Sequence, residues 1–193
     1  MIDNIIIIDN VIPKIKQIKI EELLSGPNTP WIYNADVTYN KAELRTRNIT
    51  NTTPGINCLF QDVTKKFETP HFQEIKCIAE EATEKINFKI KMIVQSRSFL
   101  QFPLNNAFQK KHDTPHIDLG MDHLVCLYYV NDTDGDTFIF DKKRGDDKPL
   151  DNLQVVKQVT PKQGRCLLFN GNHYHASSGP TLDIRCIINF DII

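Results

Sequence analysis

The sequence predicts a mainly β protein with flanking helices, an α+β class in which helices pack on a β-sandwich or jelly roll. Segments with helical periodicity fall within residues 1–87, whereas residues 88–193 contain a series of short apolar runs separated by turn residues. Helices followed by many short strands are typical of layered β folds. The sequence contains neither G-x-G-x-x-G nor G-x-x-x-x-G-K-[ST], so a nucleotide-binding fold has no support.

In the N-terminal part, the apolar residues 4–8 predict a short strand. The pattern from Ile15 to Leu24 predicts a helix that ends at Gly26-Pro27. Residues 30–33 predict an extended apolar segment.

The clearest helix is predicted over residues 71–86, directly after Pro70. Its apolar residues recur at helical spacing: Phe72, Ile75, Ala79, Ala82 and Ile86. The candidate strands of the jelly-roll core follow it: residues 88–95, 97–102, 124–130, 137–141, 154–159, 165–169 and 184–190.

The length, composition and net charge of the chain limit the class of protein to which it can belong. The chain has 193 residues, 40% of them hydrophobic and 24% charged, and we expect one domain over residues 1–193. The net charge of -1 disfavours a protein that binds nucleic acid or a membrane surface through bulk charge. The longest apolar run, Ile5–Ile8, is far too short to span a bilayer. Asp3 disfavours a secretion signal, so a cytoplasmic protein is expected.

The cysteines indicate a reducing environment. There are 5 of them, an odd number, and no two are spaced as C-x-x-C. A disulfide framework or a zinc–thiolate site is therefore disfavoured, and buried reduced thiols are expected. The five are Cys58, Cys77, Cys126, Cys166 and Cys186.

The segment His116-Ile117-Asp118 places an imidazole and a carboxylate two positions apart. On an extended chain these side chains point to the same side, so both could bind one metal ion. One distant histidine would complete the two-histidine, one-carboxylate set of non-haem Fe(II) oxygenases, which leaves three positions open. A His-x-Asp pair is common by chance, so the pair alone is weak evidence for a metal site.

Arg185 opens the apolar strand Arg185-Cys-Ile-Ile-Asn-Phe190. An arginine that enters a buried strand is costly unless it meets an anion. Its guanidinium is suited to bind a carboxylate through two hydrogen bonds. The alternative is a structural salt bridge within the protein.

Six short stretches between Thr114 and Ile192 carry a family resemblance. They are Pro115-His-Ile-Asp118, Leu127-Tyr-Tyr-Val-Asn131, Asp134-Gly-Asp-Thr-Phe138, Gly164-Arg-Cys-Leu-Leu-Phe169, His175-Ala-Ser-Ser178 and Arg185-Cys-Ile-Ile-Asn-Phe190. In this order they resemble the 2-oxoglutarate- and Fe(II)-dependent oxygenases, specifically the prolyl-4-hydroxylase-like branch also met in marine phages. For a phage-encoded protein the expected location is the host cytoplasm.

The resemblance implies a double-stranded β-helix, which is a jelly roll. It also implies a reaction in which O2 oxidatively decarboxylates 2-oxoglutarate while a second substrate is hydroxylated. Carried over position by position, the Fe(II) ligands, and thus the catalytic residues, would be His116, Asp118 and His175.

Further residues would bind the cosubstrate 2-oxoglutarate. Arg185 and Tyr129 match family positions that reach its far carboxylate. Tyr128 is the alternative to Tyr129, because adjacent strand residues face opposite ways. Asn189, on the same strand face as Arg185, and Gln101, on the strand before the His-x-Asp pair, are expected as additional cosubstrate-binding residues.

Other histidines compete for the third ligand position. His173 has the same parity as His175, but the following Ala-Ser-Ser and the spacing to Arg185 favour His175. His173 is then expected in a loop near the mouth of the site. His112 and His123 flank the site and are expected to be polar loop histidines.

The residues at three positions disfavour particular subgroups of this family. Asp191 stands where nucleic-acid demethylases of the AlkB type carry a second arginine. Ile187 stands where desaturase-like plant and antibiotic enzymes carry serine, and the intact Asp118 argues against a halogenase. The resemblance therefore implies hydroxylation of a peptide, with a prolyl residue favoured, or of a small molecule, without a nucleic-acid or membrane partner.

Two alternatives to a 2-oxoglutarate-dependent hydroxylase stay open. One is a jelly-roll protein that binds a metal or ligand without turnover. The other is a cupin-like dioxygenase that needs no 2-oxoglutarate, and Arg185 is the feature against it. The oligomeric state does not follow from the sequence.

Residues 40–57 are polar and lack a clear period. Long structureless loops in compact domains are often functional or disordered. We expect this segment to be a lid over the substrate entrance, and a permanently disordered loop is the alternative.

Overall fold

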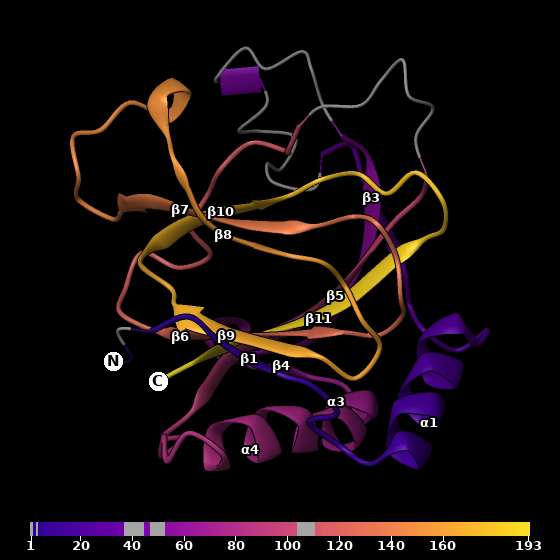
Figure 1. Ribbon diagram of the computed structural model, residues 1–193. Helices are drawn as coiled ribbons and strands as arrows, with labels where there is room; N and C mark the ends of the chain where they lie inside the picture. Colours follow the sequence, from indigo (N-terminus) through magenta and orange to yellow (C-terminus); the bar gives the residue numbers. More distant parts are fainter. Residues whose placement is uncertain (1, 3, 37–44, 47–52, 104–110) are drawn as a thin grey trace.

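Two antiparallel sheets pack face to face in the computed structural model, which describes residues 2, 4–36, 45–46, 53–103 and 111–193 (Figure 1). The larger sheet has the order β1 (Ile6–Ile8), β9 (Cys166–Asn170), β6 (Leu124–Tyr129), β11 (Arg185–Ile192), β5 (Ile93–Gln101), β3 (Gly55–Asp62) and β2 (Ile32–Asn34), with β4 (Phe67–Glu68) paired to β3. The smaller sheet has the order β10 (His173–Ser177), β7 (Thr137–Lys143) and β8 (Val155–Val159). The predicted jelly roll with flanking helices is confirmed.

The three longer helices of the described residues lie on the outer face of the larger sheet (Figure 1). They are α1 (Lys14–Ser25), α3 (Pro70–Ile75) and α4 (Cys77–Glu84), and the short 3-10 helices are η1 (Val63–Lys65) and η3 (Leu150–Asn152). The helix predicted over 71–86 is thus divided at Lys76, although Lys76 keeps right-handed helical angles. None of the described helices is long and apolar enough to span a membrane.

Apolar side chains form two main layers and a smaller cluster of Phe138, Phe140 and Ala176. The outer layer, between the helices and the larger sheet, includes Phe60, Ile78 and Phe190. The inner layer, between the two sheets, includes Leu127, Ile139 and Ile187. Full burial of one such side chain contributes about 1.5–3 kcal/mol. Because strand residues alternate between faces, Tyr128 joins the outer layer and Tyr129 the inner one.

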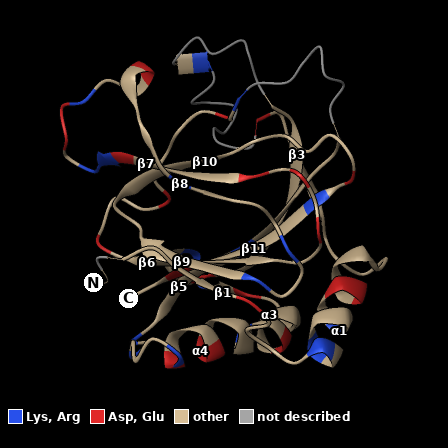
Figure 2. Ribbon diagram, in the orientation of Figure 1, with Lys and Arg blue, Asp and Glu red and all other residues tan. Residues whose placement is uncertain are grey.

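Charged residues are concentrated on the helices and loops, and the central strands of the larger sheet are mainly uncharged (Figure 2). In β5, β6, β9 and β11, all described in full, the charged residues are Arg97, Arg185 and Asp191. A charge between two packed sheets is costly without a partner. These three residues therefore mark the part of the fold where polar chemistry has replaced apolar packing.

Several predicted elements are corrected. The two strands predicted over 88–95 and 97–102 are replaced by one strand, β5, which runs from Ile93 to Gln101 without a break. Strand β5 pairs with β3 on one side and with β11 on the other. Strands β3 and β10 were not predicted, since polar residues interrupt their apolar pattern. In the predicted lid, residues 55–57 belong to β3, and residues 40–44 and 47–52 lie outside the described part of the chain.

All five cysteines are free thiols. Cys58, Cys126, Cys166 and Cys186 are buried and Cys77 is half-buried, so the expectation of buried reduced thiols is confirmed for four of them. Burial raises the pKa of Cys58 to about 11. Thiols in this state are poor nucleophiles.

The loop between β9 and β10 contains a glycine that is required by packing. A Cβ at Gly171 would lie 2.1 Å from Nε2 of His123, a fully buried ring. We expect Gly171→Ala to lower the free energy of unfolding by about 1–3 kcal/mol, measured by urea denaturation, because the ring has no space to move into.

Gly120→Ala is the matched control. A Cβ at Gly120 would meet nothing within 4 Å, so this change should stay within about 0.5 kcal/mol of the wild type. Equal stability of the two variants would contradict the packing of His123 against Gly171.

Candidate metal centre and active site

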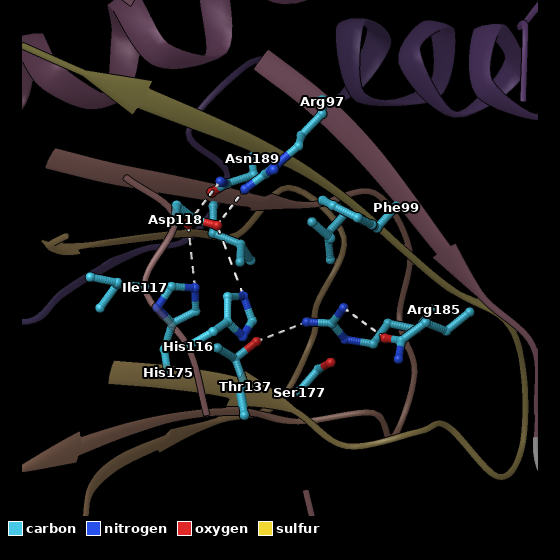
Figure 3. A pocket seen from close by; sticks show the side chains of 14 residues that line it. Arg97, Phe99, His116, Ile117, Asp118, Thr137, His175, Ser177, Arg185 and Asn189 are labelled. Atoms are coloured by element: carbon cyan, nitrogen blue, oxygen red, sulfur yellow. Dashed lines mark hydrogen bonds and ion pairs between the residues drawn. The ribbon is translucent and has the colours of Figure 1, made fainter. Parts of the chain in front are cut away.

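A pocket of about 290 Å³ lies between the two sheets. Its walls come from β5, β6, β7, β10 and β11, together with residues 116–118 (Figure 3). Polar side chains gather at its two ends, one group around Asp118 and the other around Arg185 (Figure 3). The inward positions of strands that are distant in sequence therefore meet in one cavity.

His116, Asp118 and His175 come together at the first end. Their candidate ligand atoms all lie within 4.8 Å of one another. Nε2 of His175 is 3.4 Å from Oδ2 of Asp118, and Nε2 of His116 is 3.9 Å from Oδ1. Two backbone hydrogen bonds of 2.9 Å join His116 to His175 and hold the His-x-Asp segment against β10.

Backbone carbonyls orient both imidazole rings. Nδ1 of His116 lies 3.2 Å from the Thr114 carbonyl, and Nδ1 of His175 lies 3.3 Å from the His173 carbonyl. A carbonyl only accepts, so each Nδ1 of a neutral ring carries the proton and each Nε2 keeps a lone pair toward Asp118. Burial and the neighbouring His175 lower the pKa of His116 to about 4, so its ring is neutral at pH 7 and available to a metal.

The Asp118 carboxylate has two further partners. Nη2 of Arg97 donates to Oδ1, and Nδ2 of Asn189 donates to Oδ2 over 3.1 Å. Burial alone would raise the pKa of Asp118, but the positive charge of Arg97 beside it outweighs this effect and holds that pKa well below its usual value. An anionic oxygen thus faces two imidazole nitrogens, a donor set that suits Fe(II).

Arg185 lies at the second end and is 3% exposed. Its Nε donates to the Gly135 carbonyl over 2.7 Å, its Nη1 to Oε1 of Gln101 over 3.1 Å, and its Nη2 to Oγ1 of Thr137 over 2.9 Å. All three acceptors are neutral, and no carboxylate in the described part of the chain forms an ion pair with this guanidinium. Burial lowers the pKa of Arg185. A carboxylate ligand would neutralise this buried charge.

Gln101 and Tyr129 flank Arg185. Nε2 of Gln101 donates to Oδ2 of Asp113 over 3.2 Å, which turns its Oε1 toward Arg185. The Tyr129 hydroxyl lies beside Thr137, yet no hydrogen bond of normal geometry joins it to any described residue. Burial raises the pKa of Tyr129 to about 12 against the opposing effect of Arg185, so the hydroxyl keeps a proton to donate.

Asn189 lines the same pocket at the Asp118 end. Its Nδ2 donates to Asp118 and to Asp191, and its described contacts are not with Arg185. Direct cosubstrate binding by Asn189 stays a prediction.

The other histidines were expected in loops. His123 does lie in the loop before β6, but it is 0% exposed, with Nε2 3.6 Å from Oδ1 of Asp191, which supplies a polar neighbour inside the fold. The expectation for His173 is wrong. His173 lies in β10 rather than in a loop, and its Nδ1 is 3.0 Å from the Phe140 carbonyl. His112 lies outside the strands, and its half-buried ring packs edge-on against Phe140 at 4.9 Å.

The sequence did not single out Arg97 or Thr137 as pocket residues. Arg97 carried the same signal as Arg185, a charge within a strand, but its partner Asp118 is not evident from the sequence. Thr137 stands in the stretch Asp134-Gly-Asp-Thr-Phe138, and its contact with Arg185 depends on how the two sheets face each other.

No protein-family model and no curated protein sequence matches the chain. Solved structures match nearly all of it. A non-haem alpha-ketoglutarate-dependent epimerase of nogalamycin biosynthesis is 12% identical, with a TM-score of 0.61 over 99% of this chain and 78% of that one. A prolyl hydroxylase from Trichoplax adhaerens, in complex with a hypoxia-inducible-factor peptide fragment, is 14% identical, with a TM-score of 0.59 over 98% and 83%. A viral collagen prolyl hydroxylase from Paramecium bursaria Chlorella virus-1, in complex with 2-oxoglutarate, is 13% identical, with a TM-score of 0.52 over 97% and 94%.

The chain has the fold of the 2-oxoglutarate- and Fe(II)-dependent oxygenases. The prolyl hydroxylases among these structures agree with the resemblance carried by the C-terminal half of the sequence. The likeness establishes the double-stranded β-helix, and the activity has to be inferred from the chemistry of the pocket.

The geometry around Asp118 predicts one divalent ion per chain. We expect His175→Ala to weaken Mn(II) binding at least about tenfold, which is about 1.4 kcal/mol, because two remaining ligands hold the ion poorly. Anaerobic titration followed by electron paramagnetic resonance measures the dissociation constant and the stoichiometry.

His71→Ala is the control, since His71 lies on α3 and contacts Glu74 away from the pocket. It should bind Mn(II) as the wild type does. If His175→Ala binds Mn(II) as tightly as His71→Ala, the ligand assignment fails.

Proposed function

We propose that this chain is a non-haem Fe(II) dioxygenase that consumes 2-oxoglutarate and O2, releases succinate and CO2, and hydroxylates a second substrate. One oxygen atom enters succinate and the other becomes the new hydroxyl group, so the atoms balance. The observation that carries the proposal is one pocket with a three-residue metal-binding set at one end and, at the other, a buried guanidinium without an anionic partner among the described residues.

The residues at both ends fit the two groups that this reaction needs. His116, Asp118 and His175 would hold Fe(II) and leave three positions open. Fe(II), when bound, supplies the binding of a 2-oxo acid and the activation of O2. Arg185 would bind the distal carboxylate, with the Tyr129 hydroxyl as a further donor. 2-Oxoglutarate carries a 2-oxo acid and a distal carboxylate, so one molecule matches both ends.

We propose a peptide, with a prolyl residue favoured, or a small molecule as the hydroxylated substrate. Solved prolyl hydroxylases with this fold, one of them holding a peptide fragment, support the peptide. The pocket of about 290 Å³ lies near the lower end of the about 300–1,000 Å³ common for ligand sites. Its volume therefore suits 2-oxoglutarate together with either one side chain of a peptide substrate or one compact small molecule.

Two other functions make different predictions. A metal-binding or ligand-binding jelly roll without turnover would form no succinate. A cupin-like dioxygenase that does not use 2-oxoglutarate would not depend on Arg185. The buried and unmatched charge of Arg185 favours the 2-oxoglutarate-dependent reaction.

The first test concerns turnover. Under anaerobic conditions, addition of Fe(II) and then 2-oxoglutarate should give a weak visible charge-transfer band, because the 2-oxo acid chelates the metal. Admission of O2 should then yield succinate. A protein that binds Fe(II) but gives neither the band nor succinate would contradict the proposed function.

The second test concerns the cosubstrate. Arg185→Ala should raise the KM for 2-oxoglutarate about 10–100-fold, since a charged hydrogen bond contributes about 1.5–3 kcal/mol. Mn(II) binding should be unchanged, because arginine is not a ligand. Arg185→Lys should fall between the wild type and the alanine variant, since it keeps the charge but loses the two-pronged geometry.

Arg165→Ala is the matched control for this test. Arg165 pairs with Asp9 at the surface and does not line the pocket, so its removal should leave the KM for 2-oxoglutarate unchanged. The cosubstrate assignment is wrong if Arg185→Ala and Arg165→Ala give the same KM.

A further inference from the structure

Behind the candidate iron site, four buried polar side chains form a continuous chain. Asn189 and Asp191 stand two positions apart on β11, and His123 precedes β6, which pairs with β11. Nδ2 of Asn189 donates to Oδ2 of Asp118 over 3.1 Å and to Oδ1 of Asp191 over 3.3 Å. Nε2 of His123 lies 3.6 Å from the same oxygen of Asp191. His123 and Asp191 are both 0% exposed.

The ring of His123 has a fixed orientation. Its Nδ1 lies 2.8 Å from the Met121 carbonyl, which only accepts, so Nδ1 of the neutral ring carries the proton. Nε2 then faces Asp191 with its lone pair. The main chain of His123 is also held, because the Gly171 N–H donates to the His123 carbonyl over 2.8 Å. His123 is therefore a rigid support on one side of Asp191.

Asp191 determines which end of the Asn189 amide faces Asp118. An amide presents either its N–H groups or its oxygen, and these ends differ in charge. Asp118 and Asp191 both accept from Nδ2 of Asn189, so its two N–H bonds point to the two carboxyl groups. A flipped amide would place its oxygen beside both carboxyl groups and remove the donor from Asp118.

A bound cation is the rival explanation for this cluster, because Asp118, His123 and Asp191 could also hold a metal ion. The Asn189 N–H groups stand between the two carboxyl groups, where a cation would be repelled. Gly171 also packs against the ring edge so closely that a Cβ there would lie 2.1 Å from Nε2 of His123. Both features favour direct contacts among these side chains over a bound cation.

We propose that Asp191, supported by His123, is a positioning residue of the iron site. It holds Asn189 so that the amide N–H fixes Oδ2 of Asp118 in the orientation that binds the metal. Such outer hydrogen bonds orient metal ligands and commonly contribute 10–100-fold to metal affinity or activity. The inference rests on the proposed function, because it takes Asp118 as a metal ligand.

Two substitutions at Asp191 separate hydrogen bonding from packing. Asp191→Asn keeps an oxygen at the Oδ1 position that accepts from Asn189. Asp191→Leu has a similar size and provides no acceptor. We expect Asp191→Leu to raise the dissociation constant for Mn(II) about 10–100-fold and Asp191→Asn to stay within about threefold of the wild type. At saturating Fe(II), the KM for 2-oxoglutarate should change less than in Arg185→Ala, because the Arg185 end is untouched.

A double-mutant cycle tests whether Asp191 acts through Asn189. Asn189→Ala alone should weaken Mn(II) binding. In this background, Asp191→Leu should weaken Mn(II) binding by less than about a further twofold, because the Asn189 side chain through which Asp191 acts is already absent. Additive effects would overturn the proposal. Asp191→Ala replaces Asp191→Leu if the leucine variant does not fold, with the same expected result.

Ser96→Ala controls for the loss of a buried polar group. Ser96 is 0% exposed on β5, opposite Phe190, and does not line the pocket, so its removal should leave Mn(II) binding unchanged.

Unaltered Mn(II) binding by Asp191→Leu overturns the proposal. Equal loss in the asparagine and leucine variants, or two Mn(II) ions per wild-type chain, also overturns it and supports a cation ligand. Failure of the wild type to bind Mn(II) would instead overturn the proposed function itself.

Discussion

The inner face of β11 imposes the strictest constraint on this fold, because polar side chains there lie between two packed sheets. Arg185, Asn189 and Asp191 point into the sandwich at alternate positions, with Ile187 among them. Each must find a partner inside the protein, since water does not compensate a buried polar group there. The surrounding strands and loops supply these partners.

At the Arg185 end, the requirement is met by neutral oxygen atoms. The Gly135 carbonyl, the Gln101 amide and the Thr137 hydroxyl come from three different segments and use the donors of the guanidinium. Gly135 has to be glycine, since a Cβ there would lie 2.7 Å from Cδ of Arg185. These three bonds use three of the five N–H groups of the guanidinium and leave its positive charge unmatched, so the pocket favours an anionic ligand.

At the Asp118 end, the electrostatic problem is the reverse. A buried carboxylate is kept ionised by Arg97 and receives a second hydrogen bond from Asn189. The apolar side chains between the helices and the larger sheet stabilise the fold. At the Asp118 end of the pocket, polar side chains that can bind a ligand occupy positions where apolar side chains would stabilise the fold more. One pocket thus combines a cation-binding end with an anion-binding end.

The sequence by itself determined the features that depend on local patterns. Alternation along an extended chain placed His116 and Asp118 on one side, and a charge at the start of an apolar strand identified Arg185. Alternation also separated Tyr129 from Tyr128, although only the packed sheets showed which of them faces inward. The mainly β class followed from the many short apolar runs, which report burial directly.

Tertiary structure alone decided the contacts between strands that are distant in sequence. The pairing of Arg97 with Asp118 and the burial of His123 beside Asp191 depend on strand order and register, which the local sequence does not encode. Strand β10 was missed because it faces the pocket, where polar residues replace the apolar residues that would have marked it. A functional pocket weakens the hydrophobic pattern from which strands are predicted, and the residues that build it become recognisable only when the sheets have packed.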